Sequence, residues 1–335
     1  MGYTTYIALG NGFSISLIDL LGKENNVDLR NLFSKGDEVP WPDNMENGFL
    51  SRKYCKSLWT LGARTTMTVN EANAFISNII TCLNVFNFAS TNNESLIDTR
   101  SEANIYITAH NELSTYLKNL FIYYNSLITD KDLGEIADKV FLIEYIKGEK
   151  QKGNEIVIIT YNYDIFLERL LKIKKIAFNV TGFTNSNAKI QVIKPHGSIS
   201  FVSKTKTIGK TFEFKNTFDS VTFDINDLTI NYTLEKDTSL VNAIIPPAGD
   251  SNRLNKGWAK TIRDSLNQII KTSTERDTLI IYGLSYDHVD RIELDEIITT
   301  ISSEINVKYI NPFPSVTFDV VLSSIFRNYI QLKKL

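Results

Sequence analysis

The sequence has few of the residues that build metal sites, disulfide frameworks or membrane spans. Its 335 residues include only 2 Cys and 3 His, too few for the paired Cys-x-x-Cys ligands of a structural zinc site, so we expect no metal. The apolar runs are far shorter than the roughly 20 residues of a membrane helix, and the start lacks a basic, apolar leader. We therefore expect a cytoplasmic protein without membrane contact, with Cys55 and Cys82 as buried thiols.

The charges nearly cancel. Lysine and arginine number 36 against 38 aspartates and glutamates, a formal net charge of −2, which argues against direct nucleic-acid binding. With 43% hydrophobic and 22% charged residues, the composition is that of a folded chain rather than a disordered one. No internal repeat or low-complexity linker divides it, so a single elaborated domain over residues 1–335 is expected.

Short apolar runs, each ended by a residue that turns the chain, predict buried parallel strands. Between the later runs, apolar residues recur every three or four positions and predict crossover helices. The same spacing predicts a closing helix over residues 318–329. This alternation indicates an α/β fold with a Rossmann-like, doubly wound parallel sheet. The predicted strands cover residues 4–10, 156–160, 190–193, 278–283 and 307–311.

Two stretches interrupt this alternation. Residues 20–151 carry helical periodicity without a comparable strand signal, and we interpret them as a helical insertion. Residues 200–237 alternate aromatic and polar residues, which predicts a β-hairpin or small antiparallel flap.

Polar or glycine-rich loops follow four of the predicted strands. In an open parallel sheet, ligands bind beyond the carboxyl ends of the strands, so these loops are where a site is expected. In the first loop, two glycines allow a tight turn and a close backbone approach to phosphate, although a plain strand-to-helix turn has the same composition. The first loop consists of Gly10, Asn11, Gly12, Phe13 and Ser14.

The second and third loops supply the side chains best suited to catalysis. Asn162 can donate and accept hydrogen bonds at once, whereas Asp164 could simply cap the next helix. His196 ends an apolar run between a proline and a glycine, which favours an acid or base role over the commoner structural one. The second loop also contains Thr160 and Tyr161.

The fourth loop repeats a Gly-x-Ser pattern, and Ile-Asn-Pro follows the last predicted strand. Any one of these motifs means little alone, but four polar loops in this order form a constellation. The residues concerned are Gly283, Ser285, Asp287 and Asn311.

The ordered motifs resemble those of the Sir2 (sirtuin-like) family. They are Gly-x-Gly-x-Ser, Thr-x-Asn-x-Asp, Lys-x-His-Gly-Ser, Gly-x-Ser-x-x-Asp and Ile-Asn-Pro, and they cover residues 1–16 and about 154–315. They are most similar to its zinc-free bacterial branch, whose members are NAD-consuming effectors of anti-phage defence. The Gly-Asn-Gly-Phe start is also similar to the AbiH group of abortive-infection proteins. The Pro-Asp-Phe-Arg loop and four-cysteine zinc module of sirtuin deacylases are absent, so deacylation is not expected.

The resemblance implies an NAD+ hydrolase, with NAD+ as substrate and no metal. His196 would accept a proton from a ribose hydroxyl or the attacking water, which Asn162 would hold. The first loop would hold the pyrophosphate, and the fourth loop with Asn311 would line the adenosine side. Asp164 and Asp287 would contact ribose or brace their loops.

Two rival functions make different demands on the sequence. A non-catalytic sensor or structural subunit that holds NAD or ADP-ribose needs the glycine loops but not both Asn162 and His196. A dehydrogenase needs an acidic residue about 20 positions beyond the first loop, on a second strand. Only Glu24 and Asp28 lie there, in a stretch without a strand signal.

An unrestrained NAD+ hydrolase would kill its host, so restraint from outside the catalytic domain is expected. We expect a homo-oligomer, with a separately encoded ATPase of the HerA kind as a candidate partner. Tyr116, Tyr123 and Tyr124 of the helical insertion offer surface for such contacts, or else cover the mouth of the site.

Overall fold

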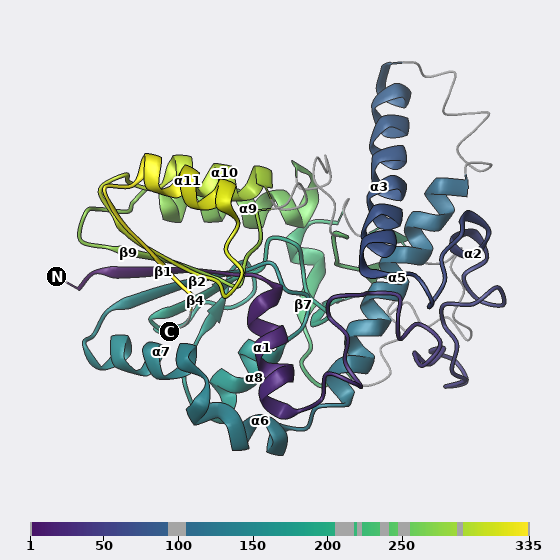
Figure 1. Ribbon diagram of the computed structural model, residues 1–335, viewed down its shortest axis with the longest axis horizontal. Coiled ribbons are helices and arrows are strands. Elements are labelled where there is room, and N and C mark those ends of the chain that lie inside the picture. The colour runs from purple at the N-terminus through teal and green to yellow at the C-terminus, as the bar shows by residue number, and fades with distance from the viewer. Residues whose placement is uncertain are drawn as a thin grey trace.

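A seven-stranded parallel sheet runs through the computed structural model (Figure 1), which describes residues 2–92, 105–204, 218–219, 223–234, 241–246, 255–286 and 291–333. The strand order is β11-β10-β9-β1-β2-β4-β3, and every neighbouring pair is parallel. The predicted α/β doubly wound sheet is thereby confirmed. Its strands are β1 (Thr4–Leu9), β2 (Glu155–Thr160), β3 (Asn179–Val180), β4 (Ile190–Ile193), β9 (Thr278–Tyr282), β10 (Asn306–Ile310) and β11 (Asn328–Leu332).

Helices cover both faces of the sheet (Figure 1). One layer consists of α1, α6, α7 and α8, and the other of α9, α10 and α11. Because both faces are covered, the central strands are continuous apolar runs rather than alternating ones. The helices are α1 (Asn11–Leu21), α6 (Asp130–Ile136), α7 (Phe141–Gln151), α8 (Phe166–Ile173), α9 (Gly257–Ile270), α10 (Arg291–Thr300) and α11 (Val316–Ile325).

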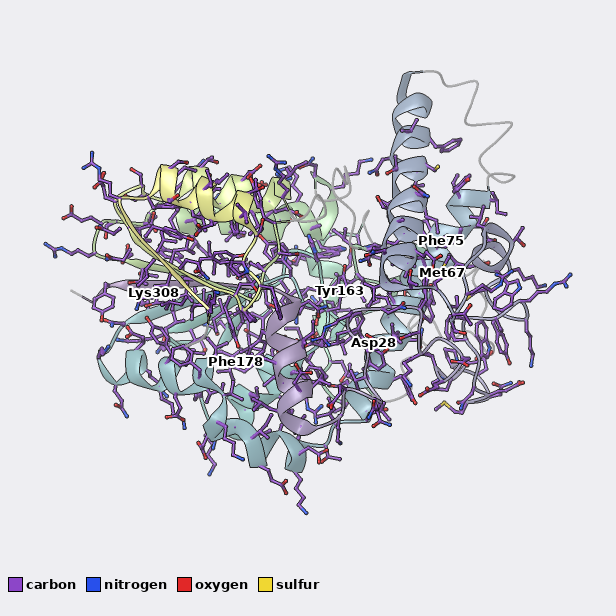
Figure 2. All side chains as sticks on the ribbon, viewed as in Figure 1. Asp28, Met67, Phe75, Tyr163, Phe178 and Lys308 are labelled. Carbon is purple, nitrogen blue, oxygen red and sulfur yellow. The ribbon has the colours of Figure 1, made fainter. Side chains whose placement is uncertain are left out.

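Three further helices project beyond the carboxyl edge of the sheet (Figure 1): α2 (Lys56–Leu61), α3 (Val69–Asn92) and α5 (Ile105–Ser126). They share an aromatic core, in which the ring of Phe33 lies 5.7 Å from that of Phe75 (Figure 2) and 5.8 Å from that of Tyr116. Of the stretch predicted as an insertion, this part projects, whereas α6 and α7 belong to the layer beside α1 and α8.

The tyrosines of α5 are less exposed than the sequence suggested. Tyr116 and Tyr124 are fully buried, and their hydroxyls donate to backbone carbonyls of residues 32 and 28. Tyr123 is half-buried and donates to Glu38. The expectation of exposed tyrosines is therefore wrong for Tyr116 and Tyr124, which build the core of the projecting helices instead of an oligomer surface.

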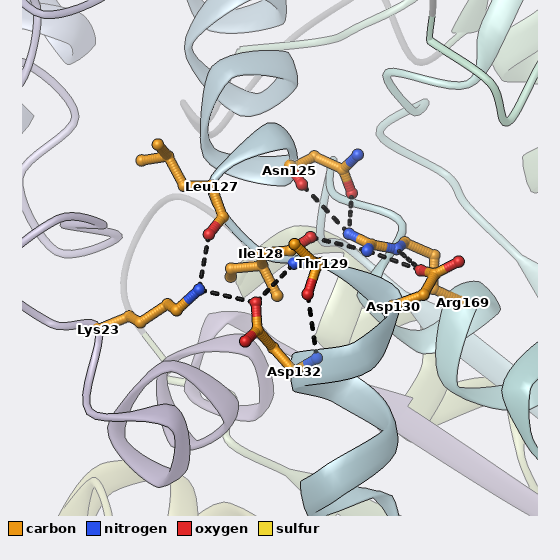
Figure 3. A network of polar contacts seen from close by, with 8 residues as sticks. All are labelled: Lys23, Asn125, Leu127, Ile128, Thr129, Asp130, Asp132 and Arg169. Atoms are coloured by element: carbon orange, nitrogen blue, oxygen red, sulfur yellow. Dashed lines mark hydrogen bonds and ion pairs between the residues drawn. The ribbon is translucent and has the colours of Figure 1, made fainter.

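Two cations hold the turn between α5 and α6 (Figure 3). Lys23, just after α1, lies 2.8 Å from the Asp132 carboxylate, and the hydrogen bond from Lys23 lowers the pKa of Asp132. Arg169 of α8 donates to the Ile128 carbonyl at 2.7 Å and to Asn125 Oδ1 at 3.0 Å. These contacts tie the projecting helices to the layer that supports the sheet.

Replacing Arg169 with methionine is expected to lower the free energy of unfolding by about 2–3 kcal/mol, because the hydrogen-bonded acceptors of the turn lose a charged donor. Urea unfolding measures the loss. Lys147→Met is the control, since Lys147 pairs with carboxylates on an exposed helix face and should change stability little. Equal losses in the two variants would contradict the role given to Arg169.

The end of the chain and the second insertion qualify the sequence predictions. Residues 328–332 form the edge strand β11, so the predicted helix over 318–329 is wrong in its last part. β5 (Phe201–Ser203) pairs antiparallel with β7 (Leu228–Ile230), which confirms a small antiparallel flap, although much of its alternating stretch lies outside the described residues.

Cys55 is buried as expected, Cys82 only half-buried, and both are free thiols. In the part of the chain described, no helix has the length and apolarity to cross a membrane.

Candidate functional site at the carboxyl edge of the sheet

The four polar loops lie side by side at the carboxyl edge of the sheet. They follow β9, β1, β2 and β4, which are consecutive neighbours in the strand order. From β1 the chain fills the sheet first on the β2 side and later on the β9 side. The boundary between β1 and β9 is therefore the topological switch point, where open α/β sheets bind ligands.

The glycines of the first and fourth loops touch through their backbones at this switch point. A Cβ on Gly12 would lie 2.6 Å from the Cα of Gly283, and one on Gly283, where φ is +63°, would lie 2.7 Å from the nitrogen of Phe13. The Gly12 N–H donates to the Gly283 carbonyl at 2.9 Å, so this amide is used inside the protein. The first turn of α1 nevertheless has no side-chain cap and no acidic residue, which suits an anion.

Asn162 is held against the first loop by its amide nitrogen. Its Nδ2 donates to the Gly10 carbonyl at 3.1 Å and to Ser14 Oγ at 2.9 Å, and Ser14 donates in turn to Asp164 at 2.7 Å. A carbonyl can only accept, so the contact with Gly10 fixes the orientation of the amide. The acceptor atom, Oδ1, is consequently the part of Asn162 that can face a ligand.

Asp164 braces the second loop. Besides the Ser14 hydroxyl, it accepts the N–H of Phe166, the first residue of α8, at 3.0 Å, although the N-cap of that helix is Ile165. Burial raises the pKa of Asp164, and the charge of Lys194 opposes that rise. The buried Lys194 donates to the Asp164 carbonyl at 2.6 Å and lies 2.9 Å from Glu168. This network sets the backbone that carries Asn162.

Other predicted residues of the first two loops also support the backbone. Asn11 donates from its exposed position to the Leu29 carbonyl at 2.7 Å, and Phe13 is buried in the core. Thr160 accepts the Asn162 N–H at 3.3 Å. These side chains shape the site instead of facing its centre.

The fourth loop is braced from the last strands. The Asn311 amide donates to the Leu284 carbonyl at 3.0 Å, while Ser285 is exposed. Asp287 lies outside the described residues. Asn311 therefore supports the loop that was predicted to line an adenosine site.

His196 and Asn162 occupy equivalent positions in the register of the paired strands β4 and β2. The strands are paired so that Ile159 is opposite Ile193, and each polar side chain follows three residues later. Adjacent strands are about 4.8 Å apart. The structure thus brings the two predicted catalytic residues to neighbouring strand ends.

Glu293 of α10 completes the site. Its Oε1 lies 2.6 Å from Nε2 of His196, and both residues are buried, at 7% and 4% exposure. Burial raises the pKa of Glu293, but the charge of His196 and its hydrogen bond outweigh that effect, so the net pKa is below the usual value. The Tyr161 ring packs edge-on against the imidazole, with 5.0 Å between centroids. The sequence reading missed Glu293, although it lies four residues before Ile297 on the apolar stripe of its helix.

The projecting helices lie beside this edge (Figure 1). Phe121 of α5 packs edge-on against Tyr163 of the second loop, with 5.2 Å between ring centroids. The Tyr163 hydroxyl donates to the Ile245 carbonyl at 2.6 Å. Asn242 donates to Thr115 of α5 at 2.6 Å. The position of α5 is therefore linked to the loop that carries Asn162.

The sequence matches no protein-family model, and comparison with curated proteins finds no relative. Its function therefore has to be inferred from the chemistry of these loops and from the motifs that they carry.

Proposed function

We propose that the chain is an NAD+ hydrolase, which cleaves the bond between nicotinamide and ribose and leaves ADP-ribose. One observation carries the proposal: an amide fixed as an acceptor, Asn162, and an imidazole backed by a carboxylate, His196, lie on neighbouring strand ends at the carboxyl edge of the sheet. The motifs that resemble the Sir2 family point to the same reaction.

The proposed reaction requires one water and one base. As the C1′–N bond breaks, its electron pair leaves with nicotinamide, which departs neutral, and positive charge builds on the ribose. Water bonds to C1′ and loses a proton, which His196 accepts. Asn162 Oδ1 accepts a hydrogen bond from the water or a ribose hydroxyl and orients it. The first turn of α1 is the proposed pyrophosphate site.

A dehydrogenase fits the fold less well. Among described residues 10–92 and 105–154, no strand of the sheet lies between β1 and β2. The acidic residue that binds the ribose in a dehydrogenase follows such a strand, so this chain has no equivalent position for it. Both carboxylate oxygens of Asp28 accept hydrogen bonds within its own turn, from the Arg30 and Asn31 N–H groups and from Ser34. Asp28 is therefore a turn residue.

Incubation of the purified protein with NAD+ tests the proposal. We expect nicotinamide and ADP-ribose to accumulate in equal amounts, as measured by chromatography, in proportion to protein concentration. Calorimetry run in parallel measures NAD+ binding. Binding without release would support the alternative, a sensor or structural subunit that holds NAD or ADP-ribose, and the absence of both would contradict either function.

We also propose that the hydrolase acts in bacterial anti-phage defence by NAD depletion and is restrained as a homo-oligomer or by a partner such as an ATPase of the HerA kind. Light scattering across micromolar concentrations, with the NAD+ assay on the same samples, tests the first form of restraint. A monomer of 38.1 kDa that is fully active alone would contradict restraint by self-assembly.

A further inference from the structure

The buried contact between His196 and Glu293 joins the two halves of the sheet. His196 follows β4, whereas Glu293 lies in the first turn of α10, which follows β9. β1 and β2 lie between those strands, so the contact spans the carboxyl edge across the switch point. A carboxylate buried to this degree is costly unless it is paired, and His196 is its partner at 2.6 Å.

The charge state of Glu293 fixes the proton arrangement of the pair. The 2.6 Å contact holds one hydrogen between Oε1 of Glu293 and Nε2 of His196, and the charge and hydrogen bond of His196 outweigh burial in lowering the pKa of Glu293, so the carboxylate is the acceptor. Nε2 of His196 must then carry the shared hydrogen.

We propose that Glu293 is a positioning residue for His196: it holds Nε2, orients the imidazole ring and stabilises the imidazolium that forms. The catalytic part of this inference rests on the proposed hydrolysis, whereas the pairing does not. The step balances, because the proton lost by water moves to the imidazole of His196 and no group is oxidised or reduced.

Other groups near the pair do not replace this carboxylate. Tyr161 presents a ring edge to the imidazole. Arg263 of α9 also lowers the pKa of Glu293, but its guanidinium is paired with Glu296 at 2.7 Å. In the part of the chain that the structure describes, Glu293 is the acidic group in contact with His196.

Glu293→Gln keeps the size of the side chain and one acceptor oxygen but removes the charge. An ionised partner favours protonated imidazole, so in E293Q we expect His196 to titrate about one pH unit lower or more, as followed by NMR of labelled histidine. A base works only when deprotonated, so the acid limb of the activity profile should also move to lower pH. We expect kcat for nicotinamide release to fall about 10- to 100-fold while KM changes less than about threefold.

Two variants control this experiment. Glu293→Asp keeps the charge at a greater distance and should recover part of the titration midpoint and of kcat. Glu296→Gln removes a charge from the same helix without touching His196 and should alter kcat less than about twofold. The spectrum of H196A identifies the resonance among the 3 histidines.

The NMR readout separates this inference from the proposed function. An unchanged His196 midpoint in folded E293Q would overturn the pairing, whatever the activity. A shifted midpoint with unchanged kcat would overturn the catalytic role of Glu293. A shifted midpoint in a protein that releases no nicotinamide would leave the pairing supported but overturn both the hydrolase and the use of Glu293 in it.

Discussion

His196→Ala is expected to reduce nicotinamide release from NAD+ by about 100- to 10,000-fold, the range that a positioned acid or base contributes. The side chain is the proposed acceptor of the proton that water loses, and alanine leaves nothing in its place. The loss should appear in kcat, because the glycine loops and the start of α1 that would bind NAD+ are untouched. Chromatographic release assays on equal amounts of folded protein measure the effect.

Asn162→Ala is the companion variant and should show a comparable loss. Asn162→Asp should be no better, since a carboxylate would direct an acceptor at the Gly10 carbonyl that Nδ2 now contacts. Asn44→Ala, an exposed change of the same kind, is the control and should leave activity intact. Wild-type rates in folded H196A and N162A would contradict the mechanism.

The loops at the carboxyl edge could be predicted because each is marked by a signal in its own stretch of sequence. A buried parallel strand is a short apolar run, and a glycine or polar residue directly after it marks the strand end. The strands before Gly10 and Gly283 were predicted to within one or two residues of their observed bounds. Given a doubly wound sheet, polar residues after the strands had to gather along one edge.

The partner of His196 could not be predicted in the same way. Glu293 lies 97 residues further along the chain and on the other side of the switch point. Its own surroundings in the sequence are those of an ordinary amphipathic helix, in which an acidic residue usually faces water. Glu293 is buried beside His196, which follows β4.

The error at the carboxyl terminus has a different physical cause. Apolar spacing from Phe318 to Ile325 is helical, and Tyr329 happens to continue it at an interval of four. β11 lies at the edge of the sheet with all five residues exposed or half-buried, so it lacks the apolar run of a central strand. At an edge, periodicity alone does not separate helix from strand.

Gly197→Ala is expected to destabilise the protein by more than about 4 kcal/mol or to prevent folding. The φ angle of Gly197 is +83°, and a Cβ there would lie 1.9 Å from the Ala243 carbonyl oxygen. The backbone cannot move away easily, because hydrogen bonds clamp it on both sides. Ser198 N–H donates to the Ala243 carbonyl at 3.1 Å, and Ile245 N–H donates to the His196 carbonyl at 3.0 Å.

Gly148→Ala is the matched control, with an effect of the opposite sign. Gly148 lies inside α7, and a Cβ there meets no atom within 4 Å, so alanine should raise stability by about 0.5–1 kcal/mol through helix propensity. Urea unfolding of both variants compares the free energy of unfolding for the same Gly→Ala substitution, once where the Cβ clashes and once where it has free space. Gly197 directly follows His196. The hydrogen bonds that leave no room for an alanine side chain at Gly197 therefore also fix the backbone that carries the imidazole. A G197A protein as stable as the wild type would show that this backbone can yield and does not fix the imidazole.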